Sequence, residues 1–431
     1  MAASGMATQA AVRADRQERL LVFTLAGIQF SHILDFMVML PLAPFLVQAL
    51  DIGTSQFALL VSVYTLAAAA SGLLSATFAD LFGRKGLLLT LFSLFALATL
   101  LCALAPNYPM LLLARGLAGV FGGVLSALLQ ATIGDVIPFE RRGRASGTVM
   151  SATAVASVLG VPTSLVLATH LGWPWPFVMI AAIAVVFVLL AARHIPPLPR
   201  PPVAHGGRTG TPPWARMAAV LRERNHALAM LFMTLGAFST FTVVPYLTLY
   251  LVGNVGLGVQ QLPMVYALGG VASFFGAHTI GRLADRWGQV RTYRLVALLS
   301  IVPLLLQTHM APMALGWVLL CSTLFFTLGS GRAIPAMAIA ISAVQAPLRG
   351  TFMSLNSALQ QLASGAAVLL AGLMVSQAPD GALSGYGSAG WLAVGLTGCT
   401  VFLAGKIRLH ARPGTPPPPS NPIHCASGEP T

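Results

Sequence analysis

The sequence predicts an all-α membrane protein with twelve transmembrane helices, arranged as two pseudo-symmetric halves of six. Three observations predict this fold: the composition, a series of twelve apolar runs, and the placement of the basic residues. Of the 431 residues, 56% are hydrophobic and 8% are charged, whereas soluble domains average about 45–50% apolar and about 25% charged residues. So few charges do not suit a surface in water, and the length accommodates twelve spans of about 20 residues with their loops.

The apolar runs follow one another along the whole chain, and each is long enough to cross a bilayer. They are continuous rather than alternating, which favours helices over the strands of a membrane barrel. Lipid cannot satisfy backbone polar groups, so a continuous spanning run is expected to be helical. The runs cover residues 20–47, 55–78, 86–105, 109–133, 146–169, 176–193, 227–252, 262–280, 294–308, 312–341, 350–376 and 389–405.

The basic residues indicate the orientation of these helices. The chain has 24 Lys and Arg residues, and the odd-numbered loops between the runs carry none of them. Because cytoplasmic loops are enriched in Lys and Arg, we expect the even-numbered loops and both termini to be cytoplasmic. This placement also accounts for the net charge of +13, so nucleic-acid binding is not expected.

The linker between the sixth and seventh runs divides the chain. Its prolines and arginines predict an extended cytoplasmic segment, and its end, Trp214–Arg224, could form a short amphipathic helix on the membrane surface. The C-terminal tail lacks apolar residues and is expected to be disordered. The four cysteines are scattered singly, so no metal site is expected. The predicted segments are an N-terminal tail at 1–19, a six-helix bundle at 20–193, the linker at 194–226, a second six-helix bundle at 227–405 and the tail at 406–431.

Three pairs of matching features lie about half a chain apart, which supports a duplicated six-helix unit. Their spacings are 204, 205 and 207 residues. The pairs are Pro41 with Pro245, Asp80 with Asp285, and Arg142-Gly143 with Arg349-Gly350.

The charged turn at 281–289 reads Gly-Arg-Leu-Ala-Asp-Arg-Trp-Gly-Gln, and it resembles the loop signature of the major facilitator superfamily. In particular it resembles the twelve-helix drug/proton antiporter-like exporters of bacteria. A weaker copy at 76–85 has Leu81 in place of a basic residue. The candidate gate-loop residues in the two copies are Asp80, Gly83, Arg84, Gly281, Asp285, Arg286 and Gly288.

The resemblance implies a role for the two aspartates of these loops. Asp80 would meet the eleventh helix and Asp285 the fifth, each in the opposite half, and the contacts would hold the inner gate shut. Leu81 then implies a weaker contact on the side of Asp80. The alternative is that the loops only anchor the topology.

Two further motifs carry the same resemblance. Arg115-Gly116 in the fourth run is similar to the family's arginine motif, and Gly160 and Pro162 in the fifth run are similar to the Gly-x-Pro motif of exporters. Ordinary glycine-rich packing is the alternative for the second motif. The resemblance implies a monomeric carrier with the major facilitator fold in a bacterial cytoplasmic (inner) membrane. It would work by alternating access, without a cofactor other than the proton gradient, and would not be an enzyme.

Asp35 is the only one of eleven acidic residues that lies within an apolar run. A carboxylate at such a depth is costly and marks a functional site by default, so Asp35 is the candidate for proton coupling. Arg115 is its natural partner, although the sequence does not decide whether the two are in contact. His32 lies one turn before Asp35 on the same helix face and could relay protons. Each of the three could instead have a structural role.

Aromatic, methionine and polar residues of the first, seventh and tenth runs are candidates for a substrate cavity, because the resemblance implies that these helices and the fourth line the centre. An apolar, aromatic cavity with few charged side chains suits a lipophilic substrate. Arg332 could line this cavity or serve in structural pairing. The candidate cavity residues are Gln29, Phe36, Met39, Phe238, Phe241, Tyr246, Phe325 and Arg332.

These observations predict proton-coupled efflux of a small lipophilic compound or drug, of the multidrug-resistance type. The partners expected are this small molecule, protons and the lipid bilayer. A sugar or metabolite exporter or facilitator of the same fold is the first alternative. A membrane sensor that transports nothing is the second.

Overall fold

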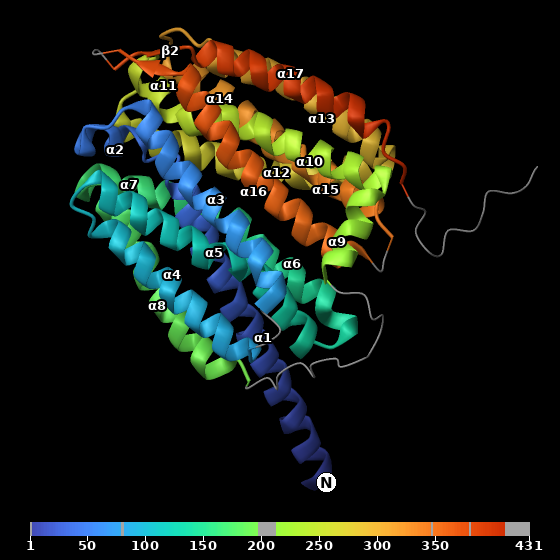
Figure 1. Cartoon of the computed structure of the whole chain (residues 1–431). Helices are drawn as coiled ribbons and strands as arrows, with labels where there is room; N and C mark the ends of the chain where they lie inside the picture. Colours follow the sequence, from blue (N-terminus) through green and yellow to red (C-terminus); the bar gives the residue numbers. More distant parts are fainter. Residues whose placement is uncertain (1, 79–81, 197–212, 346–347, 379–380, 410–431) are drawn as a thin grey trace, which may run out of the picture.

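The computed structural model describes residues 2–78, 82–196, 213–345, 348–378 and 381–409. Its helices form two adjacent bundles, one from the N-terminal half of the chain and one from the C-terminal half (Figure 1). Within the described residues, twelve helical segments are long and apolar enough to cross a membrane, which confirms the predicted fold class.

Within its described residues, the N-terminal half contains nine helical elements. These are α1 (Ala2–Val38), α2 (Ala43–Leu50), α3 (Thr54–Phe78), α4 (Arg84–Ala103), α5 (Tyr108–Val136), α6 (Phe139–Val155), the π-helix η2 (Ala156–Gly160), α7 (Val161–Leu171) and α8 (Pro174–His194).

The C-terminal half has a similar series and a two-stranded antiparallel hairpin in its last loop, in which Ser376 pairs with Ser384. Its elements are α9 (Pro213–Arg222), α10 (Arg224–Val243), the 3-10 helix η3 (Val244–Tyr246), α11 (Leu247–Gly253), the 3-10 helix η4 (Val259–Gln261), α12 (Leu262–Trp287), α13 (Gln289–Thr308), α14 (Leu315–Gly331), α15 (Ala333–Ser342), α16 (Arg349–Met374), β1 (Ser376–Gln377), β2 (Leu383–Ser384) and α17 (Tyr386–Ala404).

Several spans are interrupted rather than continuous. The first span breaks at residues 39–42, around Pro41, and the seventh breaks at η3, which contains Pro245. Proline has no backbone N–H and its ring clashes with the preceding turn, so it interrupts a helix. The breaks fall at equivalent places in the two halves, as the repeat predicts. The tenth span breaks at Arg332, between α14 and α15.

The boundaries of the predicted segments shift by a few residues at both ends of the bundles. The helix of the first span begins at Ala2, so the predicted boundary between the N-terminal tail and the bundle at residue 20 is not a helix end. The expected amphipathic helix at 214–224 is α9, and α10 begins at Arg224 rather than at 227. Residues 197–212 and 410–431 lie outside the described residues. The predicted extended linker and disordered tail fall mainly on these residues, so both stay predictions.

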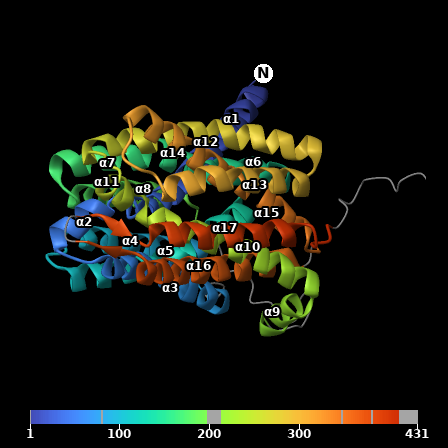
Figure 2. The same cartoon turned by 90° about the horizontal axis from the view of Figure 1, so that it is seen from above.

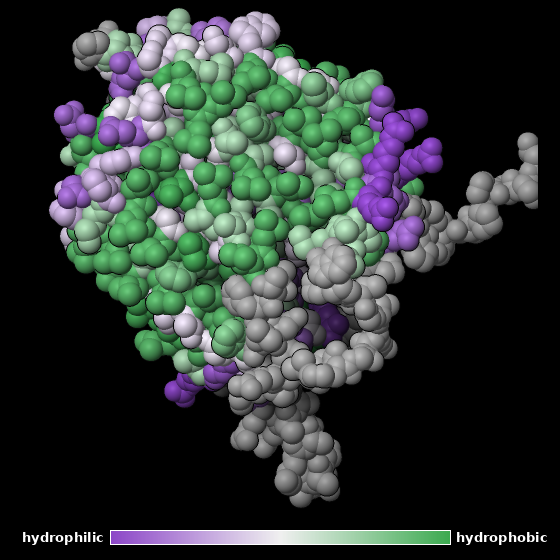
Figure 3. All heavy atoms as spheres, in the orientation of Figure 1, coloured by the Kyte–Doolittle hydropathy of each residue, from purple (hydrophilic) through white to green (hydrophobic). Residues whose placement is uncertain are grey.

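The two ends of the bundle differ in their loops. We call the end with loops at 48–54, 106–108, 170–175, 253–261, 309–311 and 377–388 the arginine-free end, because these loops contain no Lys or Arg. The opposite end, with Arg84, Arg141 and Arg282, is the arginine-rich end. Between them the surface is largely hydrophobic, while polar residues gather at opposite edges (Figure 3). Exposed side chains such as Leu189, Phe275 and Leu373 belong to this apolar belt, which suits contact with lipid.

The two halves pack against each other most closely through α3 and α16, which lie side by side (Figures 1 and 2). Near the arginine-free end, Thr54 donates a hydrogen bond to the carbonyl oxygen of Val375 at 2.9 Å. Further along, the Ser62 hydroxyl donates to the carbonyl oxygen of Gly365, also at 2.9 Å. At this end Gly372 approaches Ala58 so closely that an added Cβ would lie 2.6 Å from the Ala58 methyl. Small residues here therefore permit close approach of the two halves.

The hydrophobic core follows the same division. One cluster includes Leu34 and Phe57 from the first half together with Tyr246 and Val368 from the second, so it continues across the interface. A second cluster, around Phe92, consists of residues of the N-terminal half. The third, around Phe352, is built on the C-terminal half. One hydrophobic cluster is thus shared by the two halves, while the other two clusters each belong to a single half.

Candidate functional site

Asp35 and Arg115 form an ion pair in the interior of the N-terminal half. Nη1 of Arg115 lies 2.8 Å from Oδ2 of Asp35, and the two side chains are 1% and 0% exposed. The second carboxylate oxygen of Asp35 accepts a hydrogen bond from the Thr99 hydroxyl at 3.2 Å. The Arg115 guanidinium also lies over the ring of Tyr64, 4.4 Å from its centroid. Four helices, α1, α3, α4 and α5, therefore meet at one pair of opposite charges.

The cost of burying these charges explains the arrangement. An isolated charge in a low-dielectric interior is unfavourable, but a paired and hydrogen-bonded charge can be accommodated. The aromatic face of Tyr64 adds a cation–π contact, which is favourable for a desolvated guanidinium. The contact between Asp35 and Arg115, which the sequence left undecided, is present in this structure.

The other polar residues of α1 lie in the same half but make separate contacts. His32 is 8% exposed, its ring lies 6.2 Å from that of Phe95, and its Nδ1 has no hydrogen-bond partner within the described residues. Gln29 accepts a hydrogen bond from Ser126 at 3.2 Å. Neither is hydrogen-bonded to Asp35, so the structure places His32 beside the pair rather than in it.

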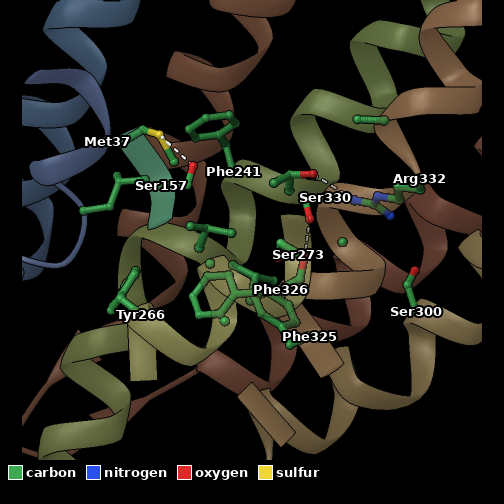
Figure 4. A pocket seen from close by; sticks show the side chains of 18 of the residues that line it. Met37, Ser157, Phe241, Tyr266, Ser273, Ser300, Phe325, Phe326, Ser330 and Arg332 are labelled. Atoms are coloured by element: carbon green, nitrogen blue, oxygen red, sulfur yellow. Dashed lines mark hydrogen bonds between the residues drawn. The ribbon is translucent and has the colours of Figure 1, made fainter. Parts of the chain in front are cut away.

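A cavity of about 360 Å³ lies between the halves, mostly within the C-terminal one (Figure 4). Phe36 and Met37 of α1 and Ser157 of η2 form its wall on the N-terminal side. The remaining wall comes from α10, α12, α13, α14 and the start of α15. Its lining residues there include Thr240, Phe241, Tyr266, Ser273, Ser300, Phe325, Phe326, Ser330 and Arg332.

An aromatic series connects this cavity to the ion pair. Phe36 lines the cavity, and its ring lies 5.8 Å from Phe241 of the opposite half. On its other side Phe36 stacks on Tyr64, with ring centroids 5.5 Å apart, and Tyr64 carries Arg115 on its face. The buried charges are therefore behind the cavity wall, two side chains away from its interior.

Arg332 is the charged residue of the cavity wall. It is 8% exposed, and its guanidinium donates hydrogen bonds to Thr240 at 2.8 Å and to Thr397 at 3.1 Å. The break between α14 and α15 positions this side chain, since Arg332 ends one helix and begins the next. Among the described residues no carboxylate is paired with it.

The structure brings only part of the predicted cavity set together. Phe36, Phe241, Phe325 and Arg332 line the cavity, whereas Gln29, Met39, Phe238 and Tyr246 do not. Met39 and Tyr246 are fully buried in the shared core, and the Tyr246 hydroxyl donates to the carbonyl oxygen of Val368. Met39 and Tyr246 lie within the breaks of the first and seventh spans, where the chain departs from α-helical geometry.

Residues of the eighth span were missed because no resemblance pointed to that helix. Tyr266, Gly269, Gly270 and Ser273 of α12 line the cavity at helical spacing. The available signal was that Tyr266 and Ser273 are seven residues apart, and so share one helix face, with glycines between them.

The predicted motif of the fifth span forms a distorted helix, but its glycine faces its own half. The π-helix η2 ends at Gly160, two residues before Pro162, and π segments and prolines are recognised causes of helix distortion. A Cβ at Gly160 would lie 2.7 Å from a methyl of Leu34 in α1. The close contact with the opposite half is made instead by Gly270 of α12, which lies against the backbone of Ser157.

The intact gate loop lies at the arginine-rich end. Asp285 is exposed and, within the described residues, makes no hydrogen bond or ion pair, so the expected contact with the fifth span is not formed in this conformation. The physical reason is that α12 packs along η2 and α7, which lie away from this loop. Arg286 is also exposed, and Gly288 has a φ of 88°, which only glycine adopts without strain.

In the other loop, Asp80 lies outside the described residues. Gly83 begins α4 as its N-cap. Arg84 forms an ion pair with Asp135 at 2.5 Å, within the N-terminal half.

A fold of two six-helix halves around a central cavity, with a buried charge pair beside it, defines a class of membrane carriers. The family model of the Major Facilitator Superfamily matches residues 25–368, so the chain belongs to this superfamily of transporters. An uncharacterised MFS-type transporter of Mycobacterium tuberculosis is 34% identical over 40% of this chain and 30% of its own length. The chloramphenicol resistance protein of Streptomyces lividans is 29% identical over 57% of this chain and 62% of its own length. The chain thus matches less than two thirds of the length of these curated relatives.

The solved structures support the fold. A bacterial homologue of the human lysosomal transporter Spinster superposes with a TM-score of 0.68 at 15% identity, covering 91% of this chain and 95% of the other. At this identity the likeness concerns the fold alone.

Proposed function

We propose that this transporter exports a small lipophilic compound in exchange for protons, by alternating access. It acts as a monomer in a bacterial cytoplasmic membrane, with both termini on the inside. The observation that carries the proposal is the buried Asp35–Arg115 pair directly behind a cavity between the two halves. Intramembrane charges of this kind mark ion and proton pathways.

The pair can couple protons because it has two states. While Asp35 is ionised, it holds Arg115 at 2.8 Å. A proton on the carboxylate removes its charge, and the guanidinium, which stays charged, is then released from a strong partner. The Tyr64–Phe36 stack transmits this change to the cavity wall, because Arg115 rests on Tyr64, and Phe36, which stacks on Tyr64, lines the cavity.

Export rather than uptake is supported by two observations. The Gly160-x-Pro162 sequence resembles the exporter motif, and it coincides with the distorted stretch of the fifth span. A relative that covers 57% of this chain is named for chloramphenicol resistance. The largely apolar and aromatic cavity wall suits a lipophilic compound.

Alternating access is supported by the asymmetry of the interface. The halves share hydrogen bonds and core at the arginine-free end, while at the other end Asp285 has no partner among the described residues. We infer from this asymmetry a conformation that is open toward the arginine-rich end, which the proposal places on the cytoplasmic side. In the opposite conformation the gate loops would close and the contacts of Thr54 and Ser62 would separate.

Purified protein in liposomes with an imposed pH gradient tests the proposal. A panel of lipophilic dyes and sugars is offered, and movement of the dyes against protons is expected. Asp35→Asn should reduce this gradient-driven movement to background while exchange of the dye without a gradient continues, which shows that the protein is folded. The matched control is Asp51→Asn, because Asp51 is exposed and in the left-handed region, which asparagine also adopts.

Gradient-driven movement that survives Asp35→Asn contradicts the coupling role. Movement of sugars but not dyes contradicts the substrate class and favours a metabolite carrier.

A further inference from the structure

The charges inside the two halves are not equivalent. In the N-terminal half the buried cation, Arg115, has a carboxylate partner at 2.8 Å. In the C-terminal half the buried cation, Arg332, contacts two hydroxyl groups but, within the described residues, no carboxylate. Asp35 is the only acid of the apolar runs, and it is bonded to Arg115. The cavity wall therefore carries an uncompensated positive charge.

An uncompensated buried cation is costly, and the cost is relieved by an anion. A guanidinium has five N–H donors, of which Thr240 and Thr397 engage two. Since Arg332 lines the cavity, the remaining donors are available to a molecule within it. The planar fork of a guanidinium matches a carboxylate, which it can bind through two parallel hydrogen bonds.

The charge of the cavity wall lies at one side of the cavity. Ser300 and Ser330 lie on the same side as Arg332, while the uncharged Met37, Ser157 and Tyr266 lie on the far side (Figure 4). A molecule that satisfies both sides has an acidic group at one end and an apolar or aromatic body.

We propose that the cavity takes an amphipathic organic acid, whose carboxylate is bound by Arg332 and whose apolar body lies against the aromatic side chains of α12 and α14. This inference rests on the proposed transport function and narrows its substrate class. It makes Arg332 a substrate-binding residue. A purely structural role, in which Arg332 only joins the α14–α15 break to α10 and α17, is the competing explanation.

Three compounds with one aromatic body and different charges separate the two explanations. These are 2-naphthylacetate, 2-naphthylacetamide and 2-(2-naphthyl)ethylamine, which are anionic, neutral and cationic. Their binding to the purified full-length protein in detergent is measured by equilibrium dialysis against protein-free micelles. We expect the acid to bind about tenfold or more tightly than the amide, since a hydrogen bond to a charged group is worth at least that factor, and the amine to bind least.

Variants assign the preference to Arg332. Arg332→Gln removes the charge but keeps a polar side chain, so it should lower the affinity for the acid to that for the amide. Arg332→Lys keeps the charge but loses the fork, so the acid should remain preferred by a smaller factor. Arg294→Gln is the matched control, because Arg294 is exposed on α13 and bonds to a backbone carbonyl at 3.1 Å. It should leave the ranking unchanged.

Wild-type protein that binds the amide or the amine as tightly as the acid overturns the proposal, and this comparison does not depend on the folding of any variant. An acid preference that survives Arg332→Gln also overturns it. The proposed transport function is tested separately, by measuring movement of the compounds in liposomes with a pH gradient. If the acid binds through Arg332 but is not moved by a proton gradient, the proposed transport function fails and the site stands. If neutral dyes are exported and the acid is not preferred, the function stands and this inference fails.

Discussion

Removing one charge of the Asp35–Arg115 pair should destabilise the protein far more than removing both. The atoms in contact are 2.8 Å apart, and at most 1% of either side chain is exposed. Two unit charges about 4 Å apart attract by about 4 kcal/mol at an effective dielectric constant of about 20. This agrees with the roughly 3–5 kcal/mol typical for removing one partner of a buried pair. Asp35→Asn and Arg115→Met should therefore each cost about 3–5 kcal/mol of unfolding free energy.

The two single variants should differ in their response to pH. Arg115→Met leaves a carboxylate that can bind a proton, so its cost should fall as the pH is lowered. Asp35→Asn leaves a guanidinium that remains charged at any working pH, so its cost relative to wild type should fall only at the lower pH at which Asp35 of the wild-type pair itself binds a proton. The double variant leaves no charge, and it should cost much less than the sum of the single variants.

Equilibrium unfolding of the full-length protein in detergent micelles gives these free energies, and the four proteins form a double-mutant cycle. The control cycle uses Glu18 and Arg141, whose atoms are also 2.8 Å apart but whose side chains are 25% and 58% exposed. This surface pair should give a coupling of about 1 kcal/mol or less. Additive costs at Asp35 and Arg115, within about 0.5 kcal/mol, would refute the reasoning that the pair is held by desolvated charge.

Two further predictions concern the gates at the two ends of the bundle. Gly372→Val should prevent closure of the arginine-free end, because a Cβ there already lies 2.6 Å from the Ala58 methyl and 2.8 Å from the Tyr246 hydroxyl; overpacking of this kind costs roughly 1–3 kcal/mol. Distances between spin labels on the loops at 48–54 and 253–261 should lengthen, and an unchanged distribution contradicts the role of this contact. Asp285→Asn should change stability by no more than about 0.5 kcal/mol, since Asp285 has no partner among the described residues, yet it should reduce transport more than Asp80→Asn does. Equal transport losses would count against unequal gates.

Much of the architecture could be predicted from the sequence because bilayer physics leaves few options. Apolar runs of spanning length must be helices, and Pro41 and Pro245 mark where the first and seventh spans break. The depth of Asp35 was predictable from its place in the first run. Its contact with Arg115 was not, because contact depends on how α1 and α5 are rotated about their axes, and an apolar run carries little information on rotation.

The cavity was predicted less well than the helices. Phe36 and Met37 line it, but Met39 does not, because the chain leaves helical geometry after Val38. Tyr266 and Phe326 contact each other in the wall, with ring centroids 5.2 Å apart. Phe326 belongs to the tenth run, whose aromatic residues were candidates, but Tyr266 was not predicted, since most spans contain aromatic residues and only tertiary packing decides which of them face inward.

The unequal charges of the two halves are informative because the halves otherwise correspond. The duplication preserves the helix breaks at Pro41 and Pro245, so the carboxylate that is paired in one half and has no counterpart in the other is a difference that the shared fold does not require. In the first half the cation is neutralised by a carboxylate of the protein itself, which a proton can discharge. In the second half the cation has no such partner among the described residues, and it faces the cavity. Proton binding and substrate binding would then belong to different halves, joined by the contact between Phe36 and Phe241 across the interface. Under this arrangement a proton and a substrate act on the same rigid-body motion without competing for one residue.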